Sequence, residues 1–163
     1  SSAINPGGIV RTPSGKHERV APRALETHEI AGVVDDWRKA AEIAKRAGFD
    51  GVEIHGANGY LLEQFIRDAV NRRTDGYGGS IANRLRLTLE VVDACVSVFG
   101  RDRVGIRLSP VTGSNNCPQD SNPQATYGTL VDALDARARE LGFVPQAQTL
   151  EVHGLCAECA AAP

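Results

Sequence analysis

GVEIHGANGY, residues 51–60, decides the fold, because an apolar strand-like run leads straight into three polar side chains. We expect a strand over residues 51–54, followed directly by the imidazole of His55, the carboxamide of Asn58 and the phenol of Tyr60. Folds built from βα units place their chemistry at the carboxyl ends of parallel strands. The stretch therefore predicts a strand and a candidate site at its end.

The rest of the chain repeats this alternation of helix and strand. Apolar residues recur at helical spacing on either side of short apolar runs. We expect helices over residues 27–47, 61–68, 81–98 and 123–141, and strands over residues 51–54, 103–108 and 149–153. Such an order, with strands that are apolar on both faces, predicts parallel βα units of an α/β fold.

Start and stop signals support the two longest helices. Thr27 and Ser80 are expected N-caps, because a side-chain oxygen at that position can accept a hydrogen bond from one of the unpaired backbone N–H groups of the first helical turn. Gly48 and Gly100 are expected to end the same helices. Residues 1–25 are rich in Gly, Pro and Arg and show no periodicity, so we expect them to be a loop.

Composition narrows the function classes. The 163 residues are 42% hydrophobic and 23% charged, with a formal net charge of −2, which is typical of a globular protein. Nothing in this charge predicts binding to nucleic acid or to an anionic membrane surface. No signal peptide or membrane span is evident, and the four cysteines do not read as a disulfide framework. The expected location is the cytoplasm.

The four candidate site residues suit reduction of a polarised substrate. His55 and Asn58 can hydrogen-bond a carbonyl oxygen, and Tyr60 can deliver a proton. Arg107, on the expected strand 103–108, brings a positive charge. Plainer alternatives stay open: Arg107 could pair with Glu53, and Tyr60 could simply pack at the start of a helix.

Other charged and thiol side chains are expected to be structural. The pairs Arg84 with Arg86 and Arg137 with Arg139 read as solvated helix faces. Cys95 falls on an apolar helix face, so burial is expected rather than reactivity.

Several ordered motifs resemble the old yellow enzyme family of FMN-dependent ene-reductases, which are TIM (β/α)8 barrels. The similarity runs from about residue 5 to about residue 134. It rests on GVEIHGANGYLL at 51–62, QF at 64–65, NRRTDGYGGS at 71–80, NR at 83–84, VGIRLSP at 104–110 and DSNP at 120–123.

The resemblance implies a role for each candidate residue. His55 and Asn58 would bind the substrate carbonyl oxygen, and Tyr60 would protonate the α-carbon after hydride reaches the β-carbon. Arg107 would lie against FMN and stabilise negative charge on the reduced ring. NADH or NADPH would be the reductant, and a small enone-type molecule the substrate.

The length departs from the family. A closed barrel needs about 250 residues, whereas this chain holds about two βα units, matching the fourth and fifth. The phosphate cradle that such barrels build after their last two strands is not among them. We therefore interpret residues 1–136 as a fragment of an FMN-binding barrel domain. A truncated or chimeric form with impaired independent activity is expected.

Residues 137–163 form an unrelated-looking tail. Its sequence, with Cys156 and Cys159 as Cys-x-x-Cys, resembles the carboxyl terminus of ferric uptake regulator-type proteins, where such a pair helps to hold zinc. His153 adds a third donor, but a structural zinc site needs four. Zinc is not expected to bind.

Three hypotheses follow from the sequence. The first is the flavin-dependent oxidoreductase fragment. The second is a metal-binding or regulatory module that uses Cys156 and Cys159. The third is a non-functional fragment, because two βα units leave strand edges and helix faces uncovered.

Overall fold

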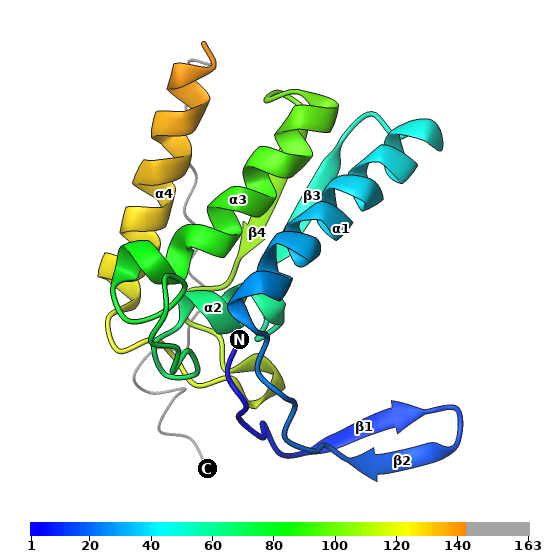
Figure 1. Cartoon of the computed structure of the whole chain (residues 1–163), viewed down its shortest axis with the longest axis vertical. Helices are drawn as coiled ribbons and strands as arrows, with labels where there is room; N and C mark the ends of the chain where they lie inside the picture. The colour runs from blue at the N-terminus through cyan, green and yellow to red at the C-terminus, as the bar shows by residue number, and fades with distance from the viewer. Residues whose placement is uncertain (143–163) are drawn as a thin grey trace, which may run out of the picture.

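The computed structural model describes residues 1–142 and shows two parallel strands covered by helices (Figure 1). In chain order the elements are β1 (Ile9–Thr12), β2 (Gly15–Glu18), α1 (Thr27–Arg46), β3 (Val52–Gly56), α2 (Leu61–Ile66), α3 (Ile81–Phe99), β4 (Val104–Leu108), a 3-10 turn (Ser114–Asn116) and α4 (Pro123–Glu140). The α/β prediction with parallel strands is confirmed, and residues 1–142 form no closed barrel.

Strands β3 and β4 pair in parallel, with Ile54 opposite Ile106 and His55 opposite Arg107. Gly51, just before β3, lies very close to the backbone just before β4: a Cβ on Gly51 would lie 2.5 Å from the carbonyl oxygen of Arg103. Only glycine fits at that point, which fixes where the two strands come together.

The main core lies between this sheet and helices α1, α2 and α3. Ile54 from β3 is 1% exposed and packs among apolar side chains of the three helices. Its buried companions are Ile30, Ala41, Leu62, Phe65, Leu87, Val91 and Cys95. Burying one such aliphatic side chain stabilises the fold by about 1.5–3 kcal/mol. The expected burial of Cys95 is confirmed.

Helix ends follow local chemistry, with one correction. Ser80 caps α3, because its side chain accepts the amide hydrogen of Asn83, and Gly100 ends that helix with φ 87°. The prediction of Thr27 as the N-cap of α1 was wrong. The cap is Glu26, which forms a reciprocal capping box with Glu29, so Thr27 is the first helical residue.

The prediction of a loop over residues 1–25 was also wrong in part. Strands β1 and β2 form an antiparallel hairpin within it, and the hairpin projects away from the helices (Figure 1). Every residue of both strands is exposed. A strand that buries neither face has no apolar alternation, so the sequence carried no periodic signal for it.

Helix α4 packs on α3 through a second, smaller core of Ile66, Leu85, Tyr127 and Leu130. It runs on to Glu140, through the boundary at 136–137 that the sequence suggested. The strand expected over residues 149–153 lies outside the described residues. Among the described helices, none combines the length and apolar character that crossing a membrane requires.

Candidate active site at the ends of strands β3 and β4

His55 and Arg107 lie side by side on one face of the sheet. They are register partners on parallel strands, so their side chains leave the same face. The neighbouring residue Ile54 points the other way, into the helix-covered core. The face that carries His55 also carries Glu53, which is exposed like Arg107. The ion pairs of residues 1–142 include none between Arg107 and Glu53.

Tyr60 lies against the imidazole of His55. The two ring centroids are 5.3 Å apart and the planes meet at 62°, an edge-to-face contact. Tyr60 itself is 54% exposed, so its hydroxyl can reach a ligand or solvent. Tyr60 is also the N-cap residue of α2, so the alternative that it packs at a helix start stays open.

The imidazole of His55 has an unused polar atom. Its Nε2 is buried and has no hydrogen-bond partner among residues 1–142. Leaving a buried donor or acceptor unsatisfied costs about 1–3 kcal/mol, and such atoms in native proteins call for an explanation. A ligand oxygen at the strand end would satisfy Nε2, so this atom fits a bound carbonyl group.

Asn58 and Gly59 form a left-handed turn between His55 and Tyr60. Their φ angles are 58° and 77°. A Cβ on Gly59 would lie 2.7 Å from both the Cβ of Cys117 and the carbonyl oxygen of Ser114, so glycine is required by conformation and by space. The side chain of Asn115 donates to the carbonyl oxygen of Asn58 at 2.8 Å. The loop after β4 thus holds the turn after β3.

A cavity of the described chain lies beside this site rather than in it. It measures about 530 Å³ and lies between Tyr60, Gln64, the residues around Cys117 and the amino-terminal segment that includes the hairpin. Of the four predicted site residues only Tyr60 lines it. The predicted site is therefore the open sheet face, with Tyr60 at the border of the cavity.

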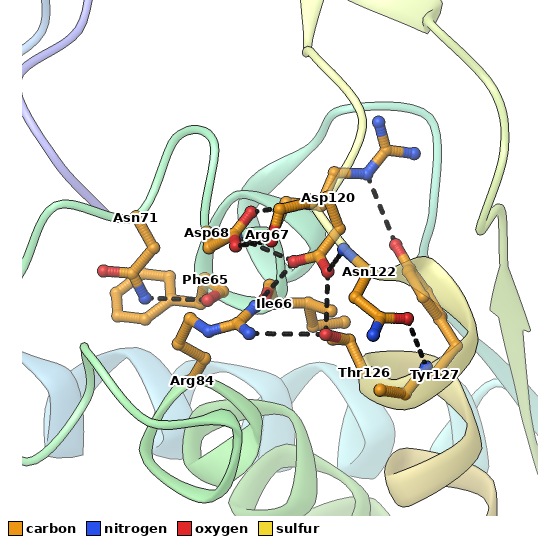
Figure 2. Close-up of polar contacts among 12 residues, drawn as sticks. Phe65, Ile66, Arg67, Asp68, Asn71, Arg84, Asp120, Asn122, Thr126 and Tyr127 are labelled. Atoms are coloured by element: carbon orange, nitrogen blue, oxygen red, sulfur yellow. Dashed lines mark hydrogen bonds and ion pairs between the residues drawn. The ribbon is translucent and has the colours of Figure 1, made fainter.

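A buried ionic network behind the strand ends was missed by the sequence analysis (Figure 2). Arg84, expected on a solvated face, is 4% exposed, and its Nη1 lies 2.7 Å from Oδ2 of Asp120. Arg84 also donates to the carbonyl oxygen of Ile66 and to Thr126. Arg86 is exposed, as expected. A signal for Arg84 did exist: it precedes Thr88, Val91 and Cys95 at spacings of four, seven and eleven, which place all four on one buried helix face.

Hydrogen bonds also stabilise the charged form of Asp120. Burial opposes its ionisation, yet donors outweigh that effect and lower the pKa of Asp120: the backbone N–H of Asp68, the Thr126 hydroxyl and the backbone N–H of Asn122, aided by the charge of Arg84. The carboxylate of Asp120 thereby joins the turn after α2 to α3 and α4 (Figure 2).

Residues 1–142 contain no group of three or more His, Cys, Asp or Glu side chains arranged for a metal ion. Cys117 is buried, and burial raises the pKa of its thiol. The candidate donors Cys156, Cys159 and His153 lie outside the described residues.

Comparison with known proteins gives one consistent result. The family described as "NADH:flavin oxidoreductase / NADH oxidase family" matches residues 2–147. A putative 12-oxophytodienoate reductase 3 from Oryza sativa subsp. japonica is 54% identical over 125 residues, covering 76% of this chain and 32% of that protein. The 12-oxophytodienoate reductase 1 of the same plant is 55% identical over 114 residues, covering 70% of this chain and 30% of its own length.

Solved structures agree. Morphinone reductase in complex with tetrahydroNAD superimposes with a TM-score of 0.78 at 49% identity, covering 83% of this chain and 39% of that one. An old yellow enzyme homologue from Zymomonas mobilis gives a TM-score of 0.80 at 39% identity, with coverage of 87% and 39%. The chain thus spans about a third of the length of the relatives it matches.

Proposed function

Because the chain belongs to the NADH:flavin oxidoreductase / NADH oxidase family, we propose that it is part of an FMN-dependent enzyme that reduces activated alkenes. NADH or NADPH would be the electron donor, and α,β-unsaturated carbonyl compounds the substrates. Names of relatives support this: the reductases from rice act on 12-oxophytodienoate, whose name denotes an oxo group and carbon–carbon double bonds. Morphinone reductase has been solved with tetrahydroNAD bound.

The observation that carries the proposal is the Nε2 of His55 at the carboxyl end of β3, a buried atom without a hydrogen-bond partner among residues 1–142. His55 and Asn58 would donate hydrogen bonds to the carbonyl oxygen of the substrate. Negative charge grows on that oxygen as the alkene is reduced, so these donors would stabilise the transition state more than the ground state.

Tyr60 would be the proton donor. Reduced FMN would supply the hydride that adds to the β-carbon of the alkene. The phenol of Tyr60 would give its proton to the α-carbon and regain one from water, which its 54% exposure permits. Its contact with His55 keeps the hydroxyl near the group that binds the carbonyl.

Arg107 would hold the anionic edge of the flavin. Its guanidinium is exposed on the same sheet face as His55, one strand away, and no described carboxylate pairs with it. An unpaired cation there suits a planar ring that becomes negatively charged on reduction.

Flavin binding and turnover test the proposal. Purified protein would be titrated with FMN while flavin fluorescence is followed, and NADPH oxidation would be measured with 2-cyclohexenone as substrate. Tyr60→Phe should slow alkene reduction by about 10²-fold or more, and His55→Ala should slow it as well. A protein that takes up no FMN and oxidises no NADPH in the presence of the enone would contradict FMN-dependent activity of this chain by itself.

We also propose that residues 1–136 belong to the flavin enzyme and that residues 137–163 are a separate tail. A reducing compartment such as the cytoplasm suits Cys95 and Cys117, which are buried free thiols. Removal of residues 143–163 should leave FMN affinity unchanged, whereas a loss of affinity would show that the tail contributes to FMN binding. Retention of zinc that depends on Cys156 and Cys159 would instead favour the metal-binding alternative.

A further inference from the structure

Glu63 is a fully buried carboxylate that accepts hydrogen bonds at both of its oxygen atoms. Its Oε1 accepts from the hydroxyls of Ser109 and Tyr127 at 2.7 and 2.8 Å and lies 3.0 Å from Nη2 of Arg67. Its Oε2 accepts the backbone N–H of Gly59 at 2.5 Å. Both Glu63 and Arg67 have 0% exposed side chains. Burial raises the pKa of Tyr127, so its hydroxyl stays protonated and donates.

These bonds end on the turn that separates the candidate site residues. The N–H of Gly59 reaches Glu63 directly, and the N–H of Asn58 donates to Oγ of Ser109 at 2.7 Å, which in turn donates to Glu63. Two consecutive amides are thus held by one carboxylate, one of them through a hydroxyl. Bonds to a charged acceptor are about twice as strong as neutral ones.

Arg67 extends the same control to the loop after β4. Its guanidinium donates to four backbone carbonyl oxygens, those of Ser109, Thr112, Cys117 and Pro118, at 2.7 to 3.1 Å. That loop also carries Asn115, which bonds the carbonyl oxygen of Asn58. The ion pair of Glu63 and Arg67 therefore joins the two segments that bound the site.

We infer that Glu63 is a positioning residue: through Gly59 and through Ser109 it fixes the left-handed turn that sets Asn58 and Tyr60 relative to His55. The inference rests on the proposed function for its catalytic meaning. Glu63 is fully buried, so it acts on the site through the turn and, by way of Arg67, through the loop after β4. A glutamine cannot replace it, because its NH2 group would face a donor at one of the two oxygen positions.

The first test measures the hydrogen bonds of the turn through its two backbone amides. In ¹H–¹⁵N spectra of the whole chain, Glu63→Gln should move the Asn58 and Gly59 amide protons upfield and speed their exchange with solvent at least 10-fold. Ser109→Ala should affect the Asn58 amide and spare that of Gly59. Glu90→Gln is the matched control, because within residues 1–142 Glu90 accepts its side-chain hydrogen bonds from Tyr77, at 3.1–3.2 Å and away from the turn.

The second test reads chemistry in FMN-loaded protein. Glu63→Gln should slow flavin reoxidation by 2-cyclohexenone more than 10-fold and leave flavin reduction by NADPH within 2-fold of wild type. A role in folding alone would lower the melting temperature and slow both half-reactions equally, which would overturn the inference. Unchanged Asn58 and Gly59 amides in both Glu63→Gln and Ser109→Ala would also overturn it.

The two proposals fail separately. Wild-type protein that binds no FMN defeats FMN-dependent activity of this chain by itself, while the amide measurements still decide the role of Glu63. If Glu63→Gln does not fold, Ser109→Ala keeps the carboxylate and its ion pair, and a selective shift of the Asn58 amide in that variant supports the inference.

Discussion

Polar groups on the two sides of the ends of β3 and β4 are arranged in opposite ways. We call the helix-covered side the region behind the strands, and the open sheet face that carries His55 and Arg107 the region in front of them. Behind the strands, Glu63, Arg67, Arg84 and Asp120 are buried and each makes several hydrogen bonds. In front of them the buried Nε2 of His55 has no described partner, and Tyr60 and Arg107 are exposed.

The difference separates stability from binding. A buried charge is tolerated only when it is paired and hydrogen-bonded, so the members of the network behind the strands depend on one another for the stability of the fold. Groups in front of the strands keep their hydrogen-bonding capacity free for a ligand. Loss of the Arg84–Asp120 pair should therefore affect folding, and loss of a group in front of the strands should affect function. Glu63 lies behind the strands but bonds the turn between the two regions, so its loss should affect function as well.

The largest effect is expected from breaking the buried pair. Asp120→Ala leaves the guanidinium of Arg84 buried without its carboxylate, which should lower the free energy of unfolding by about 3–5 kcal/mol. Urea denaturation followed by circular dichroism measures this. Asp93→Ala is the matched control, because the pair of Asp93 with Arg137 at 3.1 Å is exposed and contributes at most about 1 kcal/mol. Equal losses in the two variants would contradict a special role for the buried network.

A smaller effect is expected at the turn that lies between the two regions. Gly59→Ala forces a side chain into left-handed backbone, at about 1–2 kcal/mol, and into contact with Cys117 and Ser114, at about 1–3 kcal/mol more. Gly79 has the same φ of 77° with nothing within 4 Å of its Cβ position. Gly79→Ala should therefore show the conformational cost alone, and denaturation midpoints that coincide for the two variants would exclude a clash at Gly59.

Acid should weaken the region behind the strands. The pKa of Asp120 is lowered below its unfolded value, so its contribution is fully present above that value and is lost as the pH falls through the folded pKa. Unfolding free energies measured between about pH 5 and pH 2 should fall less steeply in Asp120→Asn than in wild type, by up to about 1.4 kcal/mol per pH unit. Parallel pH profiles would show that Asp120 does not supply this dependence.

The smallest stability effect is expected in front of the strands. Arg107→Ala removes an exposed side chain without a described ion-pair partner, so the unfolding free energy should change by no more than about 0.5 kcal/mol. FMN affinity should nevertheless fall. Arg103→Ala removes another exposed arginine, just before β4, and should leave that affinity unchanged. A strong loss of stability in Arg107→Ala would show that Arg107 stabilises the fold, like the buried residues behind the strands.

Sequence reasoning found what is encoded locally. The capping serine at residue 80, the stop at Gly100 and the parallel strand that leads to His55 follow from short patterns, and the structure has all three. The hairpin at residues 9–18 was missed because it buries neither face. Arg84 was misplaced because a charge on a helix is usually solvated, and its partner Asp120 is 36 residues away.

The sequence by itself determined the parallel βα order and the family, and it proposed four candidate site residues, because each depends on spacing along the chain. Tertiary structure alone decided which charges are buried. Glu63 finds Ser109 and Tyr127 across 46 and 64 residues, and only folding brings such distant donors around one carboxylate. A short pattern cannot carry that information, since burial and pairing of a charge are set by the elements packed around it.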